Sequence, residues 1–500
     1  MKLDFFWVLI GIAVYLGTLL LVLFWTRAKS TSEGDGKRQE FFLGRRGQRG
    51  LHPILLLISY AATVYSAFTL IGLPGLVYKH GVGAFGSIVI AQLLQVACVL
   101  FFGMALWRRT QEFEGVTSPI EIVSRSYDSR GLGLIVFLAT VVFVIPHLTL
   151  QLVGIGRLIA GVTGDRVGYV EGVGCILLIM VLYSEFGGFR GIVWTDVLQF
   201  SLSIIGIAAL AWIFVQRSWD GDLGNIADSL RQNGRGDLLT LPGPDGYYTA
   251  PMLFSLCVFY GLWPIAHPSS SVRFLAQTSP RGFLWMVVGM ALLPILMFTP
   301  GLIIGLGGAA SHPGLSHSAK IAGTVVMDVI ETGGALAMVF GLFYILGSLS
   351  AAMSTCDSQA LAMGQIVSRD LVKGVLAPKI SPKNEMRSAR YAIVAVFLIA
   401  YLAGMRDSEL ILRLSIISGA GTAILVPTYL GIRLRRPDKK AAFASIAAGY
   451  LAFAVLETRV EPQSFYGFHN SLWAVGTSTL LYLGVSARGF IHLRGFLRRI

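Results

Sequence analysis

The sequence predicts an all-α, polytopic membrane protein with about 13 transmembrane helices. Of its 500 residues, 54% are hydrophobic and only 13% are charged, and the charges cluster between long apolar runs. Soluble globular domains carry roughly 25% charged residues. Several of the apolar runs exceed the ~18 residues that mark a membrane-spanning helix. The mean hydropathy of +0.69 belongs to the same class of protein.

The expected spans follow one another along the whole chain. They are residues 4–26, 51–78, 84–107, 131–162, 168–186, 192–216, 249–272, 282–308, 334–368, 388–405, 408–431, 440–457 and 470–487. The first apolar run, Phe5 to Trp25, is too long for a signal peptide and lacks a small-x-small cleavage site, so we expect a retained helix. The largest polar loops are 217–248 and 369–387, and residues 310–333 have the spacing of a short surface helix.

The positive charge of the chain predicts its orientation. The formal net charge is +13, and 29 of the 40 Lys and Arg residues fall in the loops on one side of the predicted spans. Positive residues stay on the cytoplasmic side of a membrane. We therefore expect a multi-pass protein of the cell inner membrane, with a periplasmic N-terminus and a cytoplasmic C-terminus. The same distribution argues against nucleic acid as a partner.

Motifs for enzyme chemistry are missing from the sequence. It contains no P-loop, no H-E-x-x-H, no G-x-S-x-G and no nucleotide fingerprint. The four cysteines lie within apolar runs and share no metal-ligand spacing, which is typical of buried thiols. We do not expect an enzyme. If the protein transports actively, its energy must come from an ion gradient.

Two spans are interrupted at matching positions. In the second, Tyr60-Ala-Ala-Thr-Val-Tyr-Ser66 precedes Gly72-Leu-Pro-Gly75, and in the seventh, Tyr260-Gly-Leu-Trp-Pro264 precedes His267-Pro-Ser-Ser-Ser271. Freed backbone groups at membrane depth are tolerated only where they face protein or water. Ordinary proline kinks are the alternative, but a pair five spans apart is typical of an inverted-repeat transporter. The expected units are a first helix and basic loop, two repeats, and accessory C-terminal helices, at 1–50, 51–216, 249–431 and 432–500.

These motifs make the chain resemble the sodium:solute symporter family, which includes bacterial pantothenate and proline permeases. The resemblance is carried by Phe41-Phe-Leu-Gly-Arg45, Gly72-Leu-Pro-Gly75, Gly187-Gly-Phe-Arg-Gly-Ile-Val-Trp-Thr-Asp196 and Ala351-Ala-Met-Ser-Thr355. The stretches Phe41–Gly83 and Tyr466-Gly-Phe-His469 are most similar to the pantothenate branch. The resemblance implies a LeuT-type five-plus-five inverted repeat. It also implies sodium-coupled import of a small solute by alternating access.

A sodium site is expected between the second and ninth spans. Ala351, Ser354, Thr355 and Ser358 fall on one face of a helix. Hydroxyls there are either ligands for a hard cation or small polar contacts between helices. The resemblance implies sodium ligation by the carbonyls of Ala62, Tyr65 and Ala351 and by the hydroxyls of Ser354 and Thr355.

Two carboxylates at membrane depth are further candidates, because an unpaired charge there costs at least a few kcal/mol. The resemblance implies a possible second cation at Asp196, Asp357 and Ser358. Alternatively Asp357 takes a proton, or Asp196 caps the sixth span beside Arg190. Proline permeases of the family carry an aspartate where this chain has Val64, which argues against a proline permease.

The solute is expected near the midplane, between the second, third, seventh and eleventh spans. The predicted lining is Tyr65, Ser66, Thr69, Gln92, Gln95, Tyr260, Trp263, His267 and Ser418. His267 is either a carboxylate ligand or a core imidazole. Arg413 either snorkels to the interface or forms a gate with Asp407 or Glu409. Half-helix ends offer amides to an anion, so a small organic carboxylate, pantothenate- or monocarboxylate-like, is the expected solute.

Two rival functions are weighed against sodium symport. Some relatives fuse this fold to a histidine kinase, but the chain ends at Ile500, soon after the last predicted helix, so we expect a transporter rather than a sensor. A proton-coupled carrier using Asp357 is the other rival. The expected cofactor is Na+, and the expected partners are a small-molecule substrate, the sodium ion and the lipid bilayer. We expect a monomer.

Overall fold

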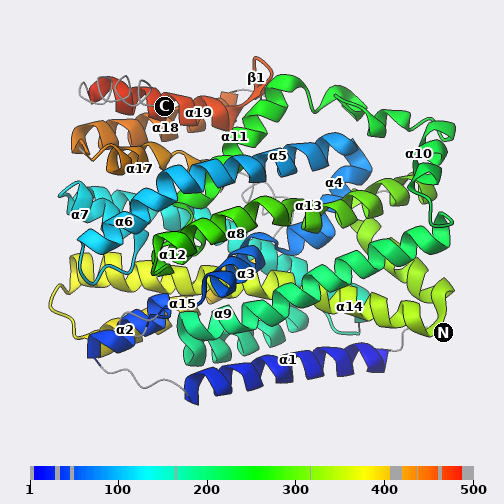
Figure 1. Cartoon of the computed structure of the whole chain (residues 1–500), viewed down its shortest axis with the longest axis horizontal. Coiled ribbons are helices and arrows are strands. Elements are labelled where there is room, and N and C mark those ends of the chain that lie inside the picture. The colour runs from blue at the N-terminus through cyan, green and yellow to red at the C-terminus, as the bar shows by residue number, and fades with distance from the viewer. Residues whose placement is uncertain are drawn as a thin grey trace.

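The computed structural model describes residues 5–28, 34–45, 50–163, 166–315, 317–405, 419–435, 437–459 and 464–486. Long helices lie side by side and run mostly along the longest axis of the molecule (Figure 1). Within the described residues, the one β-structure is a hairpin in which β1 (Ser464–Phe465) pairs antiparallel with β2 (Phe468–His469). The architecture is therefore an elongated helical bundle.

The helices of the first half of the chain are α1 (Phe5–Ala28), α2 (Gly34–Leu43), α3 (Pro53–Val64), η1 (Phe68–Gly72), α4 (Leu73–His80), α5 (Val82–Cys98), η2 (Val99–Gly103), α6 (Met104–Glu112), α7 (Pro119–Ser126), α8 (Arg130–Thr163), α9 (Tyr169–Ser218), α10 (Leu223–Gln232), η3 (Gly236–Leu239) and η4 (Pro244–Gly246). Those of the second half are α11 (Ala250–Ala266), α12 (Pro268–Ala276), α13 (Pro280–Ser311), η5 (Ser318–Lys320), α14 (Ile321–Ile366), η6 (Val367–Leu376), α15 (Pro382–Gly404), α17 (Val426–Arg433), α18 (Lys439–Arg459) and α19 (Asn470–Val485).

Many of these helices are long and apolar enough to cross a bilayer. Among the described residues there are 8 such helices, or up to 10 if each of two bent pairs is one span. A further apolar helix, Tyr169–Val181, is shorter. The predicted number of about 13 stays a prediction, because the eleventh expected span begins within 406–418, outside the described residues.

Both predicted interrupted spans are present. α3 and the η1–α4 segment meet at 56°, and α11 and α12 meet at 58°. The first break lies at Tyr65 and not at Gly72-Leu-Pro-Gly75, and the second lies at His267 and not at Pro264. Gly72-Leu-Pro-Gly75 belongs to the continuous η1–α4 helix after the break. Pro74 supplies no backbone N–H there, and the Leu70 carbonyl accepts from the Tyr344 hydroxyl at 2.6 Å instead. The breaks are therefore a few residues away from the prolines that signalled them.

Two sharp turns lie inside long helices. Gly188 divides α9 with a φ of 54°, and Gly334 divides α14 with a φ of 70°. At these dihedral angles a Cβ is strongly disfavoured, so glycine is required. The fifth and sixth expected spans are thus joined directly at Gly188. The expected surface helix within 310–333 becomes the segment 321–333, which turns at Gly334 into the ninth span.

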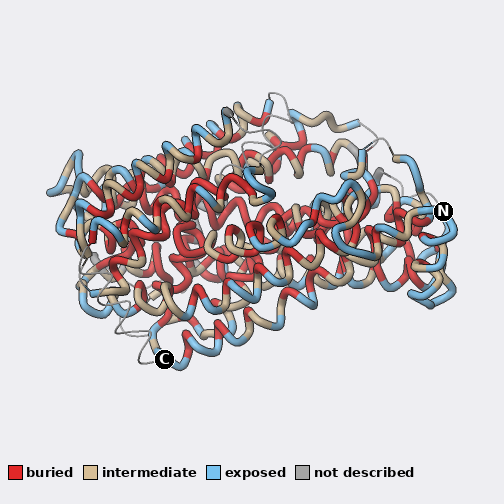
Figure 2. Tube along the Cα trace, turned by 90° about the horizontal axis from the view of Figure 1, so that it is seen from above, coloured by how far each residue is buried: buried red, intermediate tan, exposed pale blue. Residues whose placement is uncertain are grey.

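The core is formed where α14 packs along α9, with α1, α3 and α13 packed against this pair. A Cβ added at Gly206 would lie 2.5 Å from the carbonyl oxygen of Phe343, and one at Gly347 would lie 2.7 Å from that of Leu202. Small residues let membrane helices approach this closely. Buried residues run through the centre of the bundle and exposed ones follow its edges (Figure 2). Leu21, Leu292 and Leu480 are each at least 70% exposed, as expected of lipid-facing side chains.

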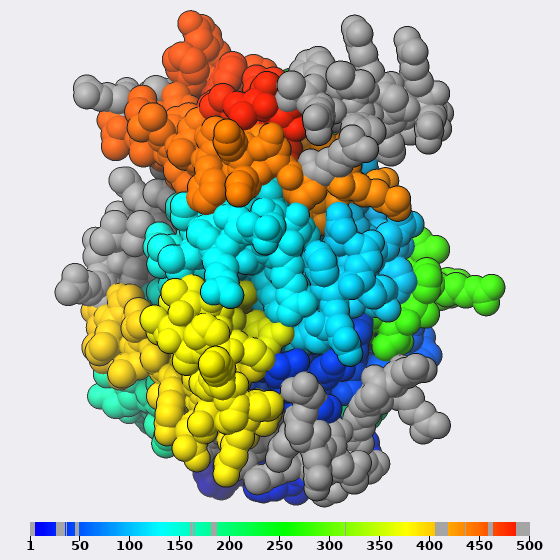
Figure 3. Space-filling view, turned by 90° about the vertical axis from the view of Figure 1, so that its left-hand side faces the viewer, coloured from blue at the N-terminus to red at the C-terminus, as the bar shows by residue number. Residues whose placement is uncertain are grey.

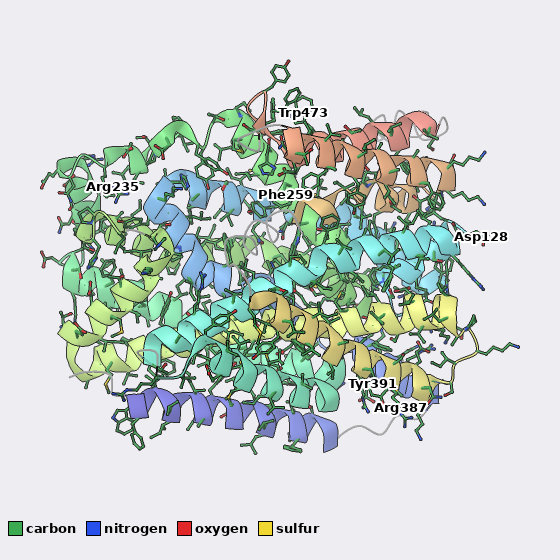
Figure 4. All side chains as sticks on the ribbon, turned by 180° about the vertical axis from the view of Figure 1, so that it is seen from behind. Asp128, Arg235, Phe259, Arg387, Tyr391 and Trp473 are labelled. Atoms are coloured by element: carbon green, nitrogen blue, oxygen red, sulfur yellow. The ribbon has the colours of Figure 1, made fainter. Side chains whose placement is uncertain are left out.

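The two ends of the bundle differ. Arg235 lies at one end, whereas Asp128 and Arg387 lie at the other (Figure 4). We call the latter the basic end; it contains α2, α7, η6 and the start of α15. Figure 3 looks onto it and shows α7 in cyan beside the yellow segment around η6.

A buried ion-pair network ties the elements of the basic end together. Arg369 of η6 bonds both carboxylate oxygens of Glu121 at 2.6 and 2.8 Å and reaches Glu385 at 3.2 Å. Lys373 and Arg38 contact the same Glu385 at 3.1 and 3.6 Å. Charges taken out of water must be paired in this way. The network joins α2, α7, η6 and α15.

Candidate ion and solute sites

The end of α3 meets the middle of α14 through hydroxyl and carbonyl oxygens. Ser354 Oγ lies 2.7 Å from the carbonyl oxygen of Ala62 and 3.1 Å from that of Ala351. Thr355 Oγ1 lies 3.1 Å from the carbonyl oxygen of Thr63 and 3.0 Å from that of Ala351. All five residues are at most 2% exposed. Oxygen atoms from the broken span and from the ninth span therefore converge.

The local sequence explains this convergence. Because α3 ends at Val64, its last backbone bond is the one that Ala61 accepts from Tyr65, and the carbonyls of Ala62 and Thr63 accept from the hydroxyls of α14 instead. The resulting set holds three carbonyls and two hydroxyls, and a hydroxyl can rotate its hydrogen aside to present a lone pair. Hard cations prefer such oxygen ligands, and half-helix ends in transporters use them for Na+. The residues present fit a sodium ion.

Four of the five predicted sodium ligands come together here. They are Ala62, Ala351, Ser354 and Thr355. Tyr65 lies at the break itself, where its ring packs against Phe200 and Phe298 with centroids 6.4 and 5.3 Å away. Among the hydrogen bonds of the described residues, none joins Tyr65 to α14. The Thr63 carbonyl is an addition that sequence reasoning missed, because the exact end of α3 was not known.

A buried arginine holds Asp196. Arg273 of α12 is 1% exposed, and its Nη2 lies 3.2 Å from Asp196 Oδ2 and 2.6 Å from Ser358 Oγ. Its Nε donates to Ser59 Oγ at 2.9 Å, and Ser59 donates to Asp196. Nη1 donates to the Ser269 carbonyl at 2.6 Å. We call Ser59, Asp196, Arg273 and Ser358 the arginine cluster; it joins α3, α9, α12 and α14.

The arginine cluster corrects the sequence analysis at one residue. The predicted seventh span ends at residue 272 and leaves Arg273 in the following loop, but α12 continues to Ala276 and the Arg273 guanidinium is buried. The sequence signal for Arg273 was a charged residue directly after an apolar run, because a charge at membrane depth is a functional candidate by default. Asp196 and Ser358, two of the residues predicted for a second cation, both contact this guanidinium.

Asp357 is separate from the arginine cluster. It is 0% exposed, and neither of its oxygens has a hydrogen-bond partner among the described residues. One turn before Asp357 on α14, Met353 Sδ accepts a hydrogen bond from the Tyr15 hydroxyl of α1 at 3.7 Å. Gln199 donates to the same hydroxyl at 3.1 Å. The three predicted second-cation residues are therefore not all brought into contact.

The predicted solute residues lie around the two breaks. Gln95 of α5 accepts from the Tyr60 hydroxyl at 3.1 Å and donates to the Tyr260 carbonyl at 2.9 Å, and so links α3, α5 and α11. Ser66 and Thr69 are buried at the first break. Gln92 is only partly buried. The links made by Gln95 place these spans next to one another, as the prediction requires.

Aromatic and imidazole rings gather at the second break. The Trp263 and His267 ring centroids are 4.4 Å apart, and His147 of α8 lies 5.9 and 6.0 Å from them. Gln359 of α14 donates its amide to His147 Nδ1 at 2.7 Å. Sequence reasoning missed His147 and Gln359, whose only signal was a polar side chain within an apolar run.

The remaining predicted residues cannot be placed in this arrangement. Ser418, and with it Arg413, Asp407 and Glu409, falls within 406–418, outside the described residues. The eleventh span's contribution to the solute site is therefore still a prediction.

Solved structures share this fold. A Na+-coupled sialic acid symporter, determined in a substrate-bound outward-open state, aligns over 95% of both chains with a TM-score of 0.75 and 17% identity. The nucleobase-cation-symport-1 family transporter MHP1, in a closed conformation, covers 87% of this chain and 92% of its own, with a TM-score of 0.56 and 14% identity. At these identities the likeness concerns the fold, and it confirms the predicted fold class.

Sequence relatives are transporters as well. The sodium/pantothenate symporter of Escherichia coli (strain K12) is 27% identical over 454 residues, which are 89% of each chain. The high-affinity proline transporter PutP of Bacillus subtilis (strain 168) is 26% identical over 418 residues, covering 81% of this chain and 84% of its own. The family model of the sodium:solute symporters matches residues 41–449 and confirms the resemblance seen in the motifs. This chain is a multi-pass membrane transporter and belongs to the sodium:solute symporter family.

Proposed function

We propose that this protein imports a small organic carboxylate together with sodium by alternating access. The observation that carries the proposal is the meeting of the Ala62, Thr63 and Ala351 carbonyls with the Ser354 and Thr355 hydroxyls. A sodium ion at this point would hold the end of α3 against α14. It would thereby favour the conformation in which both are packed together, since a ligand shifts an equilibrium toward the state it binds better.

The orientation follows the positive-inside rule. We propose that the basic end faces the cytoplasm of the cell, with the N-terminus outside and the protein in the inner membrane. The ion-pair network of Arg369, Lys373 and Arg38 lies at this end, and positive residues accumulate on cytoplasmic loops. Sodium entry from the opposite end would then run down its gradient.

The start of α12 supports an anionic group on the solute. The first amides of a helix have no intrahelical acceptor, and the helix dipole adds positive charge there. Ser270 Oγ and His267 Nε2 are buried beside this start and have no hydrogen-bond partner among the described residues. Ser269 Oγ lies 2.8 Å from His267 Nδ1, and by donating to it would leave the ring proton on Nε2. Half-helix starts bind substrate carboxylates in such transporters.

A second cation at Asp196, Asp357 and Ser358 stays a prediction. The Arg273 guanidinium already supplies positive charge at two of these residues. A single mobile sodium, held by the α3–α14 oxygens, is therefore the coupling ion that we propose.

Uptake by purified protein in liposomes tests the proposal. Labelled pantothenate should accumulate under an inward sodium gradient and should not when choline replaces sodium at constant pH. Ser354→Ala combined with Thr355→Val removes both hydroxyls and should abolish the sodium dependence. Ser201→Ala is the matched control, because Ser201 is exposed on α9 and bonds only its own helix. Accumulation driven by a proton gradient in choline, or unchanged in the double variant, would defeat the proposal.

A further inference from the structure

A second group of polar side chains borders the ring cluster on the side of α8 and α14. His147 and Gln151 lie one turn apart on α8 and so share a face. Gln359 of α14 reaches His147 with its amide nitrogen at 2.7 Å. Gln151 and Gln359 are 1% and 0% exposed. We call His147, Gln151 and Gln359 the amide subsite.

The amide subsite has free acceptors. Gln151 Oε1 and Gln359 Oε1 are both buried and have no hydrogen-bond partner among the described residues. Buried polar atoms are nearly always paired, and leaving one unpaired is destabilising. Because the Gln359 nitrogen is used by His147, its oxygen is the atom left to bind something else. A ligand donor would remove this cost.

The position of the amide subsite connects it with the solute. His147 shares its ring contacts with Trp263 and His267, 5.9 and 6.0 Å away, and His267 directly precedes α12. The start of α12 and the amide subsite are opposite in hydrogen-bonding character. The start of α12 offers donors to an anion, whereas the glutamine oxygens offer neutral acceptors. A carboxylate placed against these oxygens would be repelled, but a hydroxyl or an amide N–H would be bound.

We propose that the amide subsite binds a hydroxyl or amide N–H donor of the transported carboxylate. The inference rests on the proposed function and narrows its substrate class. The protein would select hydroxylated or N-acylated acids over acids that carry a carboxylate alone. Specificity of this kind is strong when a buried polar group of the site is left unpaired by the wrong ligand.

Matched ligand pairs test the inference. N-acetylglycine and levulinate differ by N–H against CH2, and lactate and propionate differ by one hydroxyl. Their binding to the purified protein in sodium is measured by thermal shift and by competition against labelled pantothenate. Within at least one pair, the donor-bearing acid should bind about tenfold more tightly, which corresponds to 1.4 kcal/mol. Equal binding within both pairs would overturn the inference.

Substitutions in the amide subsite test whether its glutamines cause the preference for donor-bearing acids. Gln359→Met and Gln151→Met keep the side-chain length and remove the acceptor, and at least one of them should reduce the preference within a pair to about twofold or less. Gln111→Met on the exposed face of α6 is the control. A preference that survives in both variants would contradict the inference.

The two proposals fail in different ways. Uptake by the unaltered protein that does not require sodium, with the ligand preference intact, refutes only the coupling mechanism. Sodium-driven uptake of every acid, with no preference for a donor, refutes only the amide subsite.

Discussion

The buried pair of Arg273 and Asp196 allows a quantitative prediction. Arg273→Met replaces the guanidinium by an apolar side chain and leaves Asp196, which is 0% exposed, without its counter-charge. Removing one partner of a buried pair destabilises a protein by about 3–5 kcal/mol, because the remaining charge is uncompensated. Asp196→Leu alone should cost a similar amount. In the double variant neither charge is left over, so its cost should be well below the sum of the two.

The assay is the free energy of unfolding in mixed micelles titrated with a denaturing detergent. A double-mutant cycle over the four proteins isolates the interaction energy, which should be at least about 2 kcal/mol for residues in direct contact. Arg231→Met is the matched control. Arg231 also bonds an aspartate, Asp228 at 2.8 Å, but both side chains are about 65% exposed, and exposed pairs contribute little. Additive single effects, or single effects as small as that of the control, would refute the reasoning.

Three further predictions concern backbone, charge network and pH. Gly334→Ala should lower the free energy of unfolding by about 1–3 kcal/mol because of its φ of 70° alone. Gly188→Ala should lower it more, because a Cβ there also meets a neighbouring ring at 2.9 Å. Equal unfolding free energies for the two variants would contradict this. Arg369→Met should lower the unfolding free energy by about 3 kcal/mol through the loss of its two bonds to Glu121, and a change below 1 kcal/mol would speak against the network. Burial lowers the pKa of His469 to about 4, so the folded protein prefers the neutral ring. The free energy of unfolding should therefore fall as the pH drops from about 6.5 toward 4, by about 2 kcal/mol at pH 5. His469→Asn should remove this loss, which a series of melting curves over pH measures.

Part of the oxygen cluster between α3 and α14 was predictable from sequence. The spacing of Ala351, Ser354, Thr355 and Ser358 places them on one helix face, and the family resemblance implied which of them would bind sodium. Gly and Pro in two matching spans indicated the breaks. The exact positions of those breaks could not be predicted from the sequence. Pro264 lies inside α11, since a membrane helix tolerates a proline whose freed carbonyl finds another partner, and the chain leaves the helix only at His267.

The partners of polar side chains were the least predictable part. Arg273 bonds Ser59, 214 residues earlier in the chain, and Gln359 bonds His147, 212 residues earlier. Periodicity reports which face of a helix is apolar, but it carries no information about which distant face lies opposite. The direction of Arg273 depends on α12 continuing past the apolar run, and this continuation is fixed by tertiary packing.

Thr63 touches both of the polar assemblies in the centre of the molecule. Its carbonyl accepts from the Thr355 hydroxyl within the proposed sodium site, while its hydroxyl donates to Ser358 of the arginine cluster at 2.9 Å. One residue thus fastens the broken span to α14 with two separate oxygens. If the end of α3 moves away from α14, both of these hydrogen bonds must break in the same movement, and a sodium ion at the proposed site would lose its α3 ligands.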